Sequence, residues 1–510
     1  MGGCITSAIV VDFGGRTTVD VQRGFISVQR LFPRAADIAT WRGLRQPCVL
    51  TWFCQHCDRR CFSAHCVQCF IPASPPAEGK LAFSRCCLSC ITSPNRSWYN
   101  LESRYCLDLC DFFWGGAILK SKVGYSTVYA ILGILLGALA LLNYLFPLNH
   151  MPSPDGPHSV GFRSFEVTNP EPIGVSGIDY SDSAKIRLDI WYPADGVSGY
   201  ERKGWINNDP IIFEGFEVMT GYPKALFEHL YKVRTNSFIG APPLRDSSSW
   251  PIVILLLGWS SISELHTSLA ESLASSGYLV VGIEHPGACA VVTFSDGSVY
   301  YFLGNDLLDG LLEGTRENKL RLLSEYLSRD IDYVIEFLKE MNEDPHSDFF
   351  ERLNMEGIGL YGHSGGGCVA IRYSLSNEGV PMVLADPTLE GFTIEELGSG
   401  LSNPVLLMTS SEWESGVNGR FLSKISEASA KQNYYLSISG MRHVDFAMVR
   451  NLSPLTYFFG ETGKFMNSKD AMNRLDSAVK FFFDSILFGR SVEELFKLSD
   501  SVPEFSLSKY

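Results

Sequence analysis

Beyond residue 110 the sequence has almost no cysteine. Twelve of its 14 cysteines lie between Cys4 and Cys110, and only Cys289 and Cys368 follow them. The C-terminal part of the chain therefore needs no disulfide framework. Its stability has to come from hydrophobic cores, and 510 residues are enough for one large core or two ordinary ones.

The sequence also lacks an excess of basic residues. It carries 42 Lys and Arg against 56 Asp and Glu, a net charge of −14, which argues against a nucleic-acid-binding surface. The charge is uneven: residues 1–122 hold 14 Lys and Arg against 8 Asp and Glu, or +6, which leaves −14 − 6 = −20 for the remainder. With 45% hydrophobic and 19% charged residues, the chain is typical of a globular protein.

One stretch lacks charge altogether. Residues 126–148 read STVYAILGILLGALALLNYLFPL, an apolar run long enough to cross a hydrocarbon layer of about 30 Å as a helix. The alternative is a buried core helix, but such a helix normally shows a polar face within a few turns, and this run shows none. We therefore predict a transmembrane helix over residues 126–148.

The flanks of this run predict its orientation. Lys120 and Lys122 precede it, whereas the following MPSPDGPH holds one acidic residue and no Lys or Arg. By the positive-inside rule, the N-terminal part is expected in the cytoplasm and the C-terminal part in a lumen or outside the cell. The run lies too far from Met1 for a simple cleaved signal peptide, so we expect a single-pass membrane anchor.

Residues 1–122 form a Cys-rich extension that we expect to be poorly ordered. The motifs CQHC (54–57) and CVQC (66–69) have ligand types suited to zinc, but the gap of eight residues is short for a ribbon or finger. Unligated, reduced or acylated cysteines are the alternative. The opening MGGCIT (1–6) fits the myristoylation pattern. A mistaken start codon upstream of the anchor would also explain this extension.

Beyond residue 150, apolar runs of strand length alternate with helical patterns. Residues 250–258, WPIVILLLG, are continuously apolar, as expected of a parallel strand with helices on both faces. Residues 265–276 have helical spacing and end at Gly277. This alternation is the pattern of βαβ units, and it predicts an α/β fold with a mostly parallel central sheet flanked by helices.

A G-x-S-x-G motif lies between a short apolar strand, residues 357–361, and a helical segment, residues 368–375. The letters alone arise easily by chance, and a glycine-rich connector is the alternative interpretation. The strand-turn-helix context favours a nucleophile elbow, in which the serine is strained and the flanking glycines prevent collisions. The turn places the serine hydroxyl at a helix N-terminus, where the dipole favours developing negative charge. The elbow residues are Gly362, His363, Ser364, Gly365 and Gly366.

A serine nucleophile needs a base, and the base needs an orienting acid; in this fold they follow in the order Ser, acid, His. Asp386 directly follows the apolar strand at residues 380–385, 22 residues after Ser364. His443 lies in a loop after the strand at residues 434–439, 79 residues after the serine. We predict Ser364 as nucleophile, Asp386 as acid and His443 as base.

Other titratable residues near these strand ends are weaker candidates. Glu412 lies in a loop after a later strand and is the reserve acid. Asp445 is only two residues beyond His443 and could hardly orient it from an independent strand. We expect His363 and His285 to shape the site rather than to react.

The tetrahedral intermediate of ester hydrolysis needs two backbone N–H donors. One comes from the residue after the nucleophile, Gly365, and the other from the loop that follows the strand at residues 250–256, where we nominate Trp259. The mechanism requires no metal and no other cofactor.

With these residues in place, residues 158–495 resemble the platelet-activating factor acetylhydrolase family, of the single-chain type related to lipoprotein-associated phospholipase A2. The resemblance lies in separate segments that keep the family's order and spacing. These segments are HSVGF, RLDIWYPA, PIVILLLGWSSISELHTSLAESLASSGYLVVGIEH, GHSGGG, MVLADP, LLMTSSEW and GMRHVDFA.

The resemblance implies an α/β-hydrolase domain over residues 158–495, with residues 496–510 as a C-terminal tail. It also implies calcium-independent hydrolysis of acetyl, short or oxidised acyl groups at the sn-2 position of glycerophospholipids. The sequence departs from the family at two points: Leu257 replaces the usual histidine before Gly258, and Gly365 replaces a residue that is often aromatic.

Two other functions remain open from the sequence. A carboxylesterase or dienelactone-type hydrolase would act on small soluble esters with the same residues. An inactive membrane-anchored binding protein would keep the fold without the chemistry. We expect a phospholipid substrate and a membrane as partners, and infer neither a nucleic acid nor an obligate protein partner.

Overall fold

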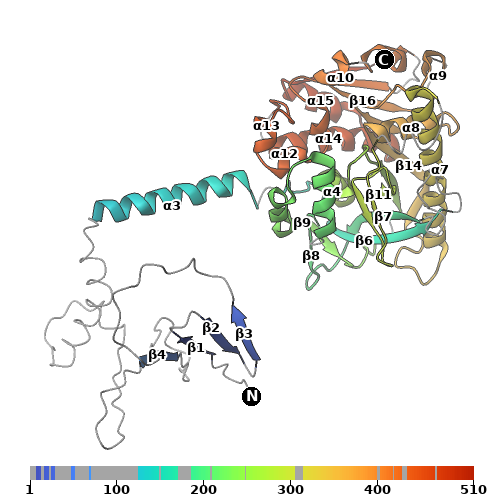
Figure 1. Cartoon of the computed structure of the whole chain (residues 1–510). Coiled ribbons are helices and arrows are strands. Elements are labelled where there is room, and N and C mark those ends of the chain that lie inside the picture. Colours follow the sequence, from blue (N-terminus) through green and yellow to red (C-terminus); the bar gives the residue numbers. More distant parts are fainter. Residues whose placement is uncertain are drawn as a thin grey trace, which may run out of the picture. The chain divides into compact units, whose positions relative to one another are not determined.

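The computed structural model describes the chain in segments (Figure 1). These are strands β1 to β5, residues 125–148, 151–169, 185–206, 210–246, 249–304, 314–398, 402–416, 418–427, 433–465 and 468–509. The chain divides into two compact units, Met1–Ile134 and Leu135–Tyr510.

The described residues of the first unit form five short strands and the beginning of a helix. The strands pair antiparallel in the order β3-β2-β1-β4-β5. Their bounds are β1 (Ser7–Asp12), β2 (Arg16–Val21), β3 (Gly24–Val28), β4 (Cys48–Thr51) and β5 (Gln68–Cys69). The zinc, acylation and disorder interpretations concern side chains and loops outside the described residues, so they stay predictions.

Helix α3 (Tyr125–Leu145) coincides with most of the predicted transmembrane run. Of the helices in the described part of the chain, it alone is long and apolar enough to cross a membrane, judged by length and composition over Thr127–Leu145. A core helix would be mostly buried, whereas no residue of this span is buried. Large aliphatic side chains are exposed along it, with Ile134 at 71%. The orientation of the span stays a prediction.

An 11-stranded sheet forms the centre of the second unit, in the order β18-β17-β16-β15-β14-β10-β11-β7-β6-β9-β8. The strands from β17 to β11 are parallel to their neighbours, whereas β18 and β7 pair antiparallel. The bounds are β6 (Ser159–Thr168), β7 (Lys185–Ala194), β8 (Arg202–Gly204), β9 (Arg234–Ile239), β10 (Trp250–Leu256), β11 (Leu279–Glu284), β14 (Leu353–His363), β15 (Met382–Ala385), β16 (Val405–Ser410), β17 (Asn433–Ile438) and β18 (Phe505–Lys509). A separate hairpin pairs β12 (Val291–Thr293) with β13 (Val299–Tyr301).

The central strands are apolar throughout because each one serves two hydrophobic cores. Every residue of β10 is buried. Since side chains alternate between the two faces of a strand, Val253 and Leu255 enter one core while Ile252, Ile254 and Leu256 enter the other. The continuous apolar run in the sequence is therefore explained, and the predicted α/β fold with a large, mostly parallel sheet is confirmed.

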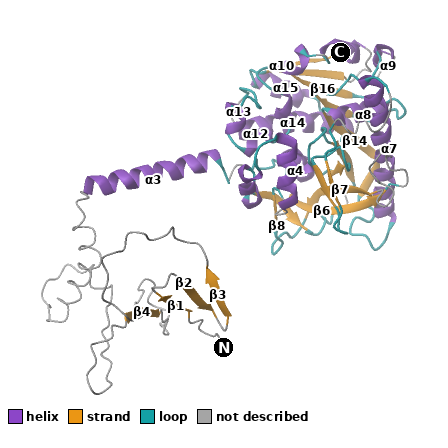
Figure 2. Ribbon diagram, in the orientation of Figure 1, coloured by secondary structure: helices purple, strands orange, loops and turns teal. Residues whose placement is uncertain are grey.

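Helices cover both faces of this sheet (Figure 2). One core is closed by α4 (Pro210–Thr220), α5 (Thr267–Ser275), α14 (Ser468–Leu487) and α15 (Glu493–Ser501). The other is closed by α7 (Arg316–Glu343), α8 (Gly365–Ser374), α9 (Ile394–Gly398) and α11 (Gly419–Glu427). The long helix α7 begins after Thr315, whose side chain caps it by accepting a hydrogen bond from the Asn318 N–H.

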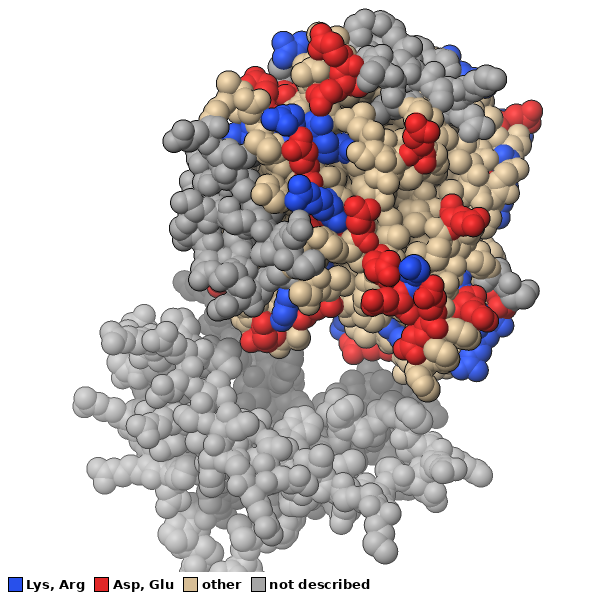
Figure 3. Space-filling model, turned by 90° about the vertical axis from the view of Figure 1, so that its right-hand side faces the viewer, with Lys and Arg blue, Asp and Glu red and all other residues tan. Residues whose placement is uncertain are grey.

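Charged side chains of both signs are interspersed over the face of the molecule in Figure 3. On the described residues of this face, Lys and Arg do not gather into a continuous patch.

The C-terminal residues 496–510 differ from the tail that the sequence suggested. They contain the end of α15 and all of β18, which pairs with β17 from Tyr434–Lys509 to Ile438–Phe505. The apolar side chain of Phe505 is buried and stacks on Phe465, with ring centroids 5.9 Å apart. The sheet therefore continues past residue 495, and the Phe505 ring belongs to the core that α4, α5, α14 and α15 close.

This arrangement predicts that Phe505→Ala lowers the free energy of unfolding by roughly 3 kcal/mol, because it removes a buried, stacked ring. The matched control is Ser506→Ala, an exposed neighbour on the same strand, with an expected change below about 0.5 kcal/mol. Urea denaturation of the detergent-solubilised chain measures both. Equal effects of the two substitutions would mean that the terminal residues do not belong to the folded sheet.

Candidate active site

Ser364 lies at a reversal of the chain between strand β14 and helix α8. The strand ends at His363 and the helix begins at Gly365, so the serine alone makes the turn. Its φ of 56° and ψ of −119° lie outside the backbone regions that residues other than glycine favour. This strained conformation is the elbow that the sequence predicted.

The flanking glycines are required by close backbone approach. A Cβ atom on Gly362 would lie 2.6 Å from the carbonyl oxygen of Gly366, and one on Gly366 would lie 2.0 Å from that of Leu256. Neither backbone oxygen can move away without disturbing the strand or helix to which it belongs. The geometry therefore excludes the alternative of a permissive glycine-rich connector.

Three side chains converge at Ser364. The Nε2 atom of His443 lies 2.9 Å from the Ser364 hydroxyl, and its Nδ1 atom lies 3.2 Å from a carboxylate oxygen of Asp386. Asp386 follows β15, and His443 begins the short helix η6 (His443–Phe446) after β17. Because β14, β15 and β17 run in the same direction, their carboxyl ends meet at one edge of the sheet. The structure thus brings together the three residues selected from the sequence.

Asp386 is fully buried and held by several donors. Ser410 donates to it through its backbone N–H (2.8 Å) and its hydroxyl (2.6 Å). Burial raises the pKa of Asp386, while hydrogen bonds from His443 and Ser410 oppose that effect. The carboxylate therefore accepts the His443 Nδ1–H, which leaves Nε2 free to accept the proton of Ser364.

The rival acids support the loop around His443 instead of its ring. Glu412 accepts the backbone N–H of His443 (3.0 Å) and pairs with Arg442 (2.9 Å). Asp445 accepts the backbone N–H of Arg442 (2.9 Å) and pairs with the buried Arg450 (2.6 Å). Both carboxylates thus fix the position of the loop.

The two neighbouring histidines have structural contacts. His363 lies with its Nε2 atom 3.0 Å from the carbonyl oxygen of His443, to which it donates. Burial lowers the pKa of His363 well below its usual value, so the ring stays neutral. His285 is paired through Nδ1 with Asp330 at 2.7 Å.

The candidate oxyanion donors lie beside the nucleophile. A Cβ atom on Gly258 would lie 3.2 Å from the Cβ of Ser364, so the loop after β10 borders the elbow directly. Within the described residues, the backbone N–H groups of Trp259 and Gly365 have no hydrogen-bond acceptor. A Cβ atom on Gly365 would meet the Trp259 indole at 2.6 Å. The indole thus occupies the space of an aromatic side chain after the nucleophile, which accounts for the glycine there.

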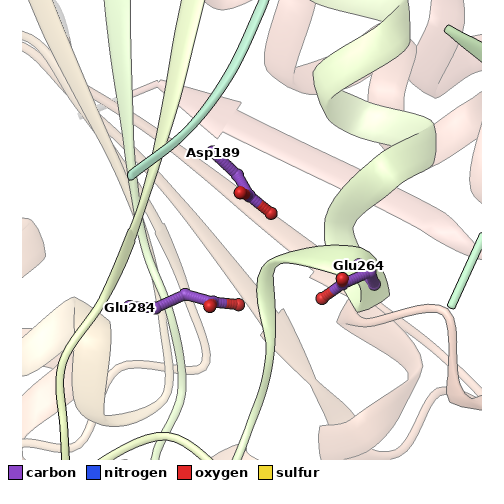
Figure 4. Close-up of side chains that lie close together, drawn as sticks. All are labelled: Asp189, Glu264 and Glu284. Atoms are coloured by element: carbon purple, nitrogen blue, oxygen red, sulfur yellow. The ribbon is translucent and has the colours of Figure 1, made fainter. Parts of the chain in front are cut away.

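A buried group of carboxylates behind this loop escaped the sequence analysis (Figure 4). Asp189 on β7, Glu264 on η5 (Ser263–His266) and Glu284 on β11 each present an oxygen within 4.8 Å of the others. Asp189 and Glu284 are each an acidic residue inside an apolar run, IRLDIWYP and VVGIE, whereas Glu264 lies in neither run.

These carboxylates are already matched by cations and hydrogen bonds. Arg187 approaches both Asp189 (3.4 Å) and Glu284 (3.6 Å), and Lys203 approaches Glu264 (3.7 Å). The donor set is therefore a charge-compensated network that does not call for a metal.

Ser263 links this network to the oxyanion loop. Its backbone N–H donates to Glu284 at 3.0 Å, and its hydroxyl donates to Asp189 at 2.7 Å while lying 2.9 Å from the same Glu284 oxygen. Ser263 ends the loop that carries Trp259, so the buried charges anchor that loop from behind.

The carboxyl groups of this network differ in protonation state. Burial raises the pKa of Glu284 to about 8, with Arg187 opposing and the Glu264 and Asp189 carboxylates adding to the shift. Burial acts in the same direction on Asp189, but Arg187 and then Lys203 outweigh it and lower its pKa. Near neutral pH, Glu284 therefore mostly retains its proton while Asp189 is ionised.

Comparisons with known proteins agree with this architecture. Residues 145–299 match the model of the family described as platelet-activating factor acetylhydrolase, isoform II. The platelet-activating factor acetylhydrolase of Cavia porcellus is 22% identical over 320 residues, which cover 58% of this chain and 68% of the relative. The resemblance to this family is thereby confirmed.

A solved structure shows the same fold. A ferulic acid esterase from Streptomyces cinnamoneus superposes with a TM-score of 0.58 at 20% sequence identity, over 71% of this chain and 100% of the esterase. At this identity the similarity establishes the fold, a large mostly parallel sheet with helices on both faces.

The Glu284 shift predicts how stability depends on pH. The folded chain keeps this proton up to about pH 8, whereas a carboxyl in the unfolded chain loses it near 4.5. The stabilisation is therefore complete below the lower value and is lost as pH rises through the higher one, at about 1.4 kcal/mol per pH unit. Glu284→Gln keeps an acceptor for Ser263, and we expect denaturation midpoints that depend less on pH in this window.

Asp476→Asn is the matched comparison, because burial also raises the pKa of Asp476 to about 8. It should flatten the same window, and the two substitutions should act additively. A Glu284→Gln profile that parallels the wild-type profile would contradict the assigned protonation state.

Proposed function

Because the chain resembles the platelet-activating factor acetylhydrolase family and has an esterase-type α/β fold, we propose that it is a serine hydrolase of phospholipid esters. Its substrate would be a platelet-activating-factor-like glycerophospholipid, such as 1-alkyl-2-acetylglycerophosphocholine, cleaved at the sn-2 acyl ester. This assignment makes it a calcium-independent phospholipase A2. It combines the chemistry of Ser364 with the substrate class of the family.

The observation that carries the proposal is the hydrogen-bonded line from Ser364 through His443 to Asp386. In the first step, the Ser364 Oγ atom forms a bond to the acyl carbon while His443 Nε2 takes the hydroxyl proton. The imidazolium then gives this proton to the departing alcohol oxygen of the lysophospholipid. Water then attacks the acyl carbon as His443 takes its proton; the bond to the Ser364 oxygen breaks, His443 returns the proton to that oxygen, and the fatty acid or acetate is released.

The backbone N–H groups of Trp259 and Gly365 would stabilise the negative oxygen of the tetrahedral intermediates. Their lack of acceptors in the described part of the chain leaves them available for this oxygen. One donor of this kind typically contributes about 3 kcal/mol of transition-state stabilisation. The buried anchor at Ser263 would keep the Trp259 donor in place.

An aromatic surface supports a membrane-bound substrate. We give this name to Tyr457, Phe458 and Phe459 at helix α13 (Leu455–Phe458), with Phe458 68% and Phe459 57% exposed. Exposed apolar side chains gathered in this way mark sites of protein or membrane interaction. Phe213 and Phe216 of the nearby helix α4 do not belong to this surface, because both are buried in the core.

The end of helix α3 lies next to this surface. The Ser453 hydroxyl donates to the carbonyl oxygen of Leu145 at 2.6 Å, two residues before α13 begins. Phe146 packs edge-on against His229, with ring centroids 5.1 Å apart. If α3 is the membrane anchor, the aromatic surface therefore lies where the chain leaves the bilayer.

The proposed chemistry predicts that Ser364→Ala abolishes fluorophosphonate labelling and hydrolysis of short-chain phosphatidylcholine, because Ser364 supplies the hydroxyl that lies 2.9 Å from His443 Nε2 and, among the described residues, no other nucleophile does so. Asp386→Asn should slow hydrolysis by about four orders of magnitude through loss of the correct His443 tautomer. Glu412→Gln, which affects the loop backbone and the Arg442 ion pair but not the His443 ring, should cost far less.

Ser376→Ala, an exposed serine just after α8, is the matched control and should label and hydrolyse normally. Labelling of the Ser364→Ala chain would overturn the assignment of the nucleophile. Turnover of nitrophenyl acetate without any phospholipid turnover would point instead to a carboxylesterase of small esters.

The proposed membrane contact predicts that the double substitution Phe458→Ser and Phe459→Ser raises KM for vesicle-bound phospholipid by about tenfold, through loss of apolar burial. Hydrolysis of a soluble nitrophenyl ester should stay unchanged, because neither ring contacts the site. Ile394→Ser, a 49% exposed residue on α9 away from α13 (Figure 1), is the control. An equal rise in KM for the control would contradict a specific surface.

A further inference from the structure

The indole of Trp413 lies flat against the imidazole of His443. The ring centroids are 4.1 Å apart and the ring planes differ by 8°. Trp413 belongs to the short helix α10 (Ser411–Ser415), which follows β16 at the same edge of the sheet as Ser364. Its Nε1–H donates to the carbonyl oxygen of Pro387 at 2.9 Å, so the indole is fixed independently of the histidine.

Helix α10 contacts both partners of the acid and base pair. Ser410 caps the helix by accepting the Trp413 N–H (3.2 Å), while its own hydroxyl donates to Asp386. Glu412 accepts the backbone N–H of His443. One segment, SSEW, thus fixes the carboxylate, the backbone and the ring face of the base.

The charged groups around His443 contact the edge of its ring, its backbone or each other. The described contacts to the face of the ring are aromatic. Asp386 meets the ring at its Nδ1 edge, and Glu412 is engaged with the backbone N–H and Arg442. Asp445 is paired with Arg450. The other ring in contact is His363, tilted by 36° at 4.9 Å, and it is neutral.

We propose that Trp413 is a positioning residue for His443 that selectively stabilises its imidazolium form. This inference rests on the proposed function, in which the Ser364 Oγ–H bond breaks as the His443 Nε2–H bond forms. The ring is then a cation until the proton passes to the leaving alcohol oxygen. Its positive charge lies against the electron-rich face of the indole during this interval.

This contact acts on the rate rather than on substrate binding. A cation is attracted to the face of an indole more strongly than to other side chains of similar size, and a neutral imidazole gains little from it. The imidazolium is formed only as the serine attacks, so the stabilisation is greater in the transition state than in the resting enzyme. The expected signature is a change in kcat with little change in KM.

The test replaces Trp413 in the full-length chain and measures hydrolysis of short-chain phosphatidylcholine across pH. For Trp413→Leu we expect kcat to fall by about 3- to 30-fold at the pH optimum with KM nearly unchanged. The acid limb of the kcat/KM profile should move to lower pH, because a less stabilised imidazolium releases its proton more readily. Trp413→Phe keeps an aromatic face but not the Nε1–H, and should restore most of both properties.

This comparison separates the proposal from a structural role. If Trp413 acts only through its bond to Pro387, Phe will be as defective as Leu and the acid limb will not move. Either result would overturn the inference. A rise in KM with an unchanged kcat would also overturn it.

A second measurement needs no turnover. A stacked imidazolium quenches indole emission, so the fluorescence of wild type minus that of Trp413→Phe should fall as the pH is lowered through the acid limb. The fall should be absent in His443→Gln. If hydrolysis were absent altogether but this quenching persisted, the proposed function would fail while the contact remained; no quenching with normal hydrolysis would reject the contact alone.

Discussion

The pairing of His443 with the buried carboxylate of Asp386 is the constraint on which the rest of the site depends. An imidazole on a surface loop could adopt either tautomer and several orientations. Asp386 accepts its Nδ1–H at 3.2 Å and is itself fixed by two hydrogen bonds from Ser410. Ser410, at the edge of the sheet, therefore fixes Asp386, and Asp386 fixes the His443 ring so that its Nε2 atom faces Ser364.

The backbone around this pair carries strain at the positions that need it. Ser364, Asp386 and Ser260 all have positive φ, at 56°, 43° and 59°, although none is glycine. Each lies just beyond the end of a central strand, where the chain turns sharply away from the sheet. The two-sided core that packs β10, β14 and β15 supplies the stability that holds these turns in place.

The sequence predicted the parts of the site that depend on strand order. Because parallel strands bring their carboxyl ends to one edge, the positions of Ser364, Asp386 and His443 after successive apolar runs were enough to expect their convergence. The roles of Glu412, Trp413 and the network around Glu284 could not be predicted in this way. Their contacts depend on the tilt of short helices and on packing between distant loops, which leave no period or spacing in the sequence. The terminal strand was missed because it is only five residues long and pairs with a strand about 70 residues earlier in the chain.

The buried acids show why burial alone does not define a reactive group. Asp386 and Glu284 are both inaccessible to water, and burial raises the pKa of each. Asp386, however, receives donors from Ser410 and His443 and has no other carboxylate among its main influences, whereas Glu284 lies among acidic neighbours and retains its proton. Asp386 can therefore orient a cationic base, whereas the neutral Glu284 accepts a hydrogen bond from Ser263. The same type of residue orients the base at one position and anchors the oxyanion loop at the other, and the difference comes from the donors that each one meets.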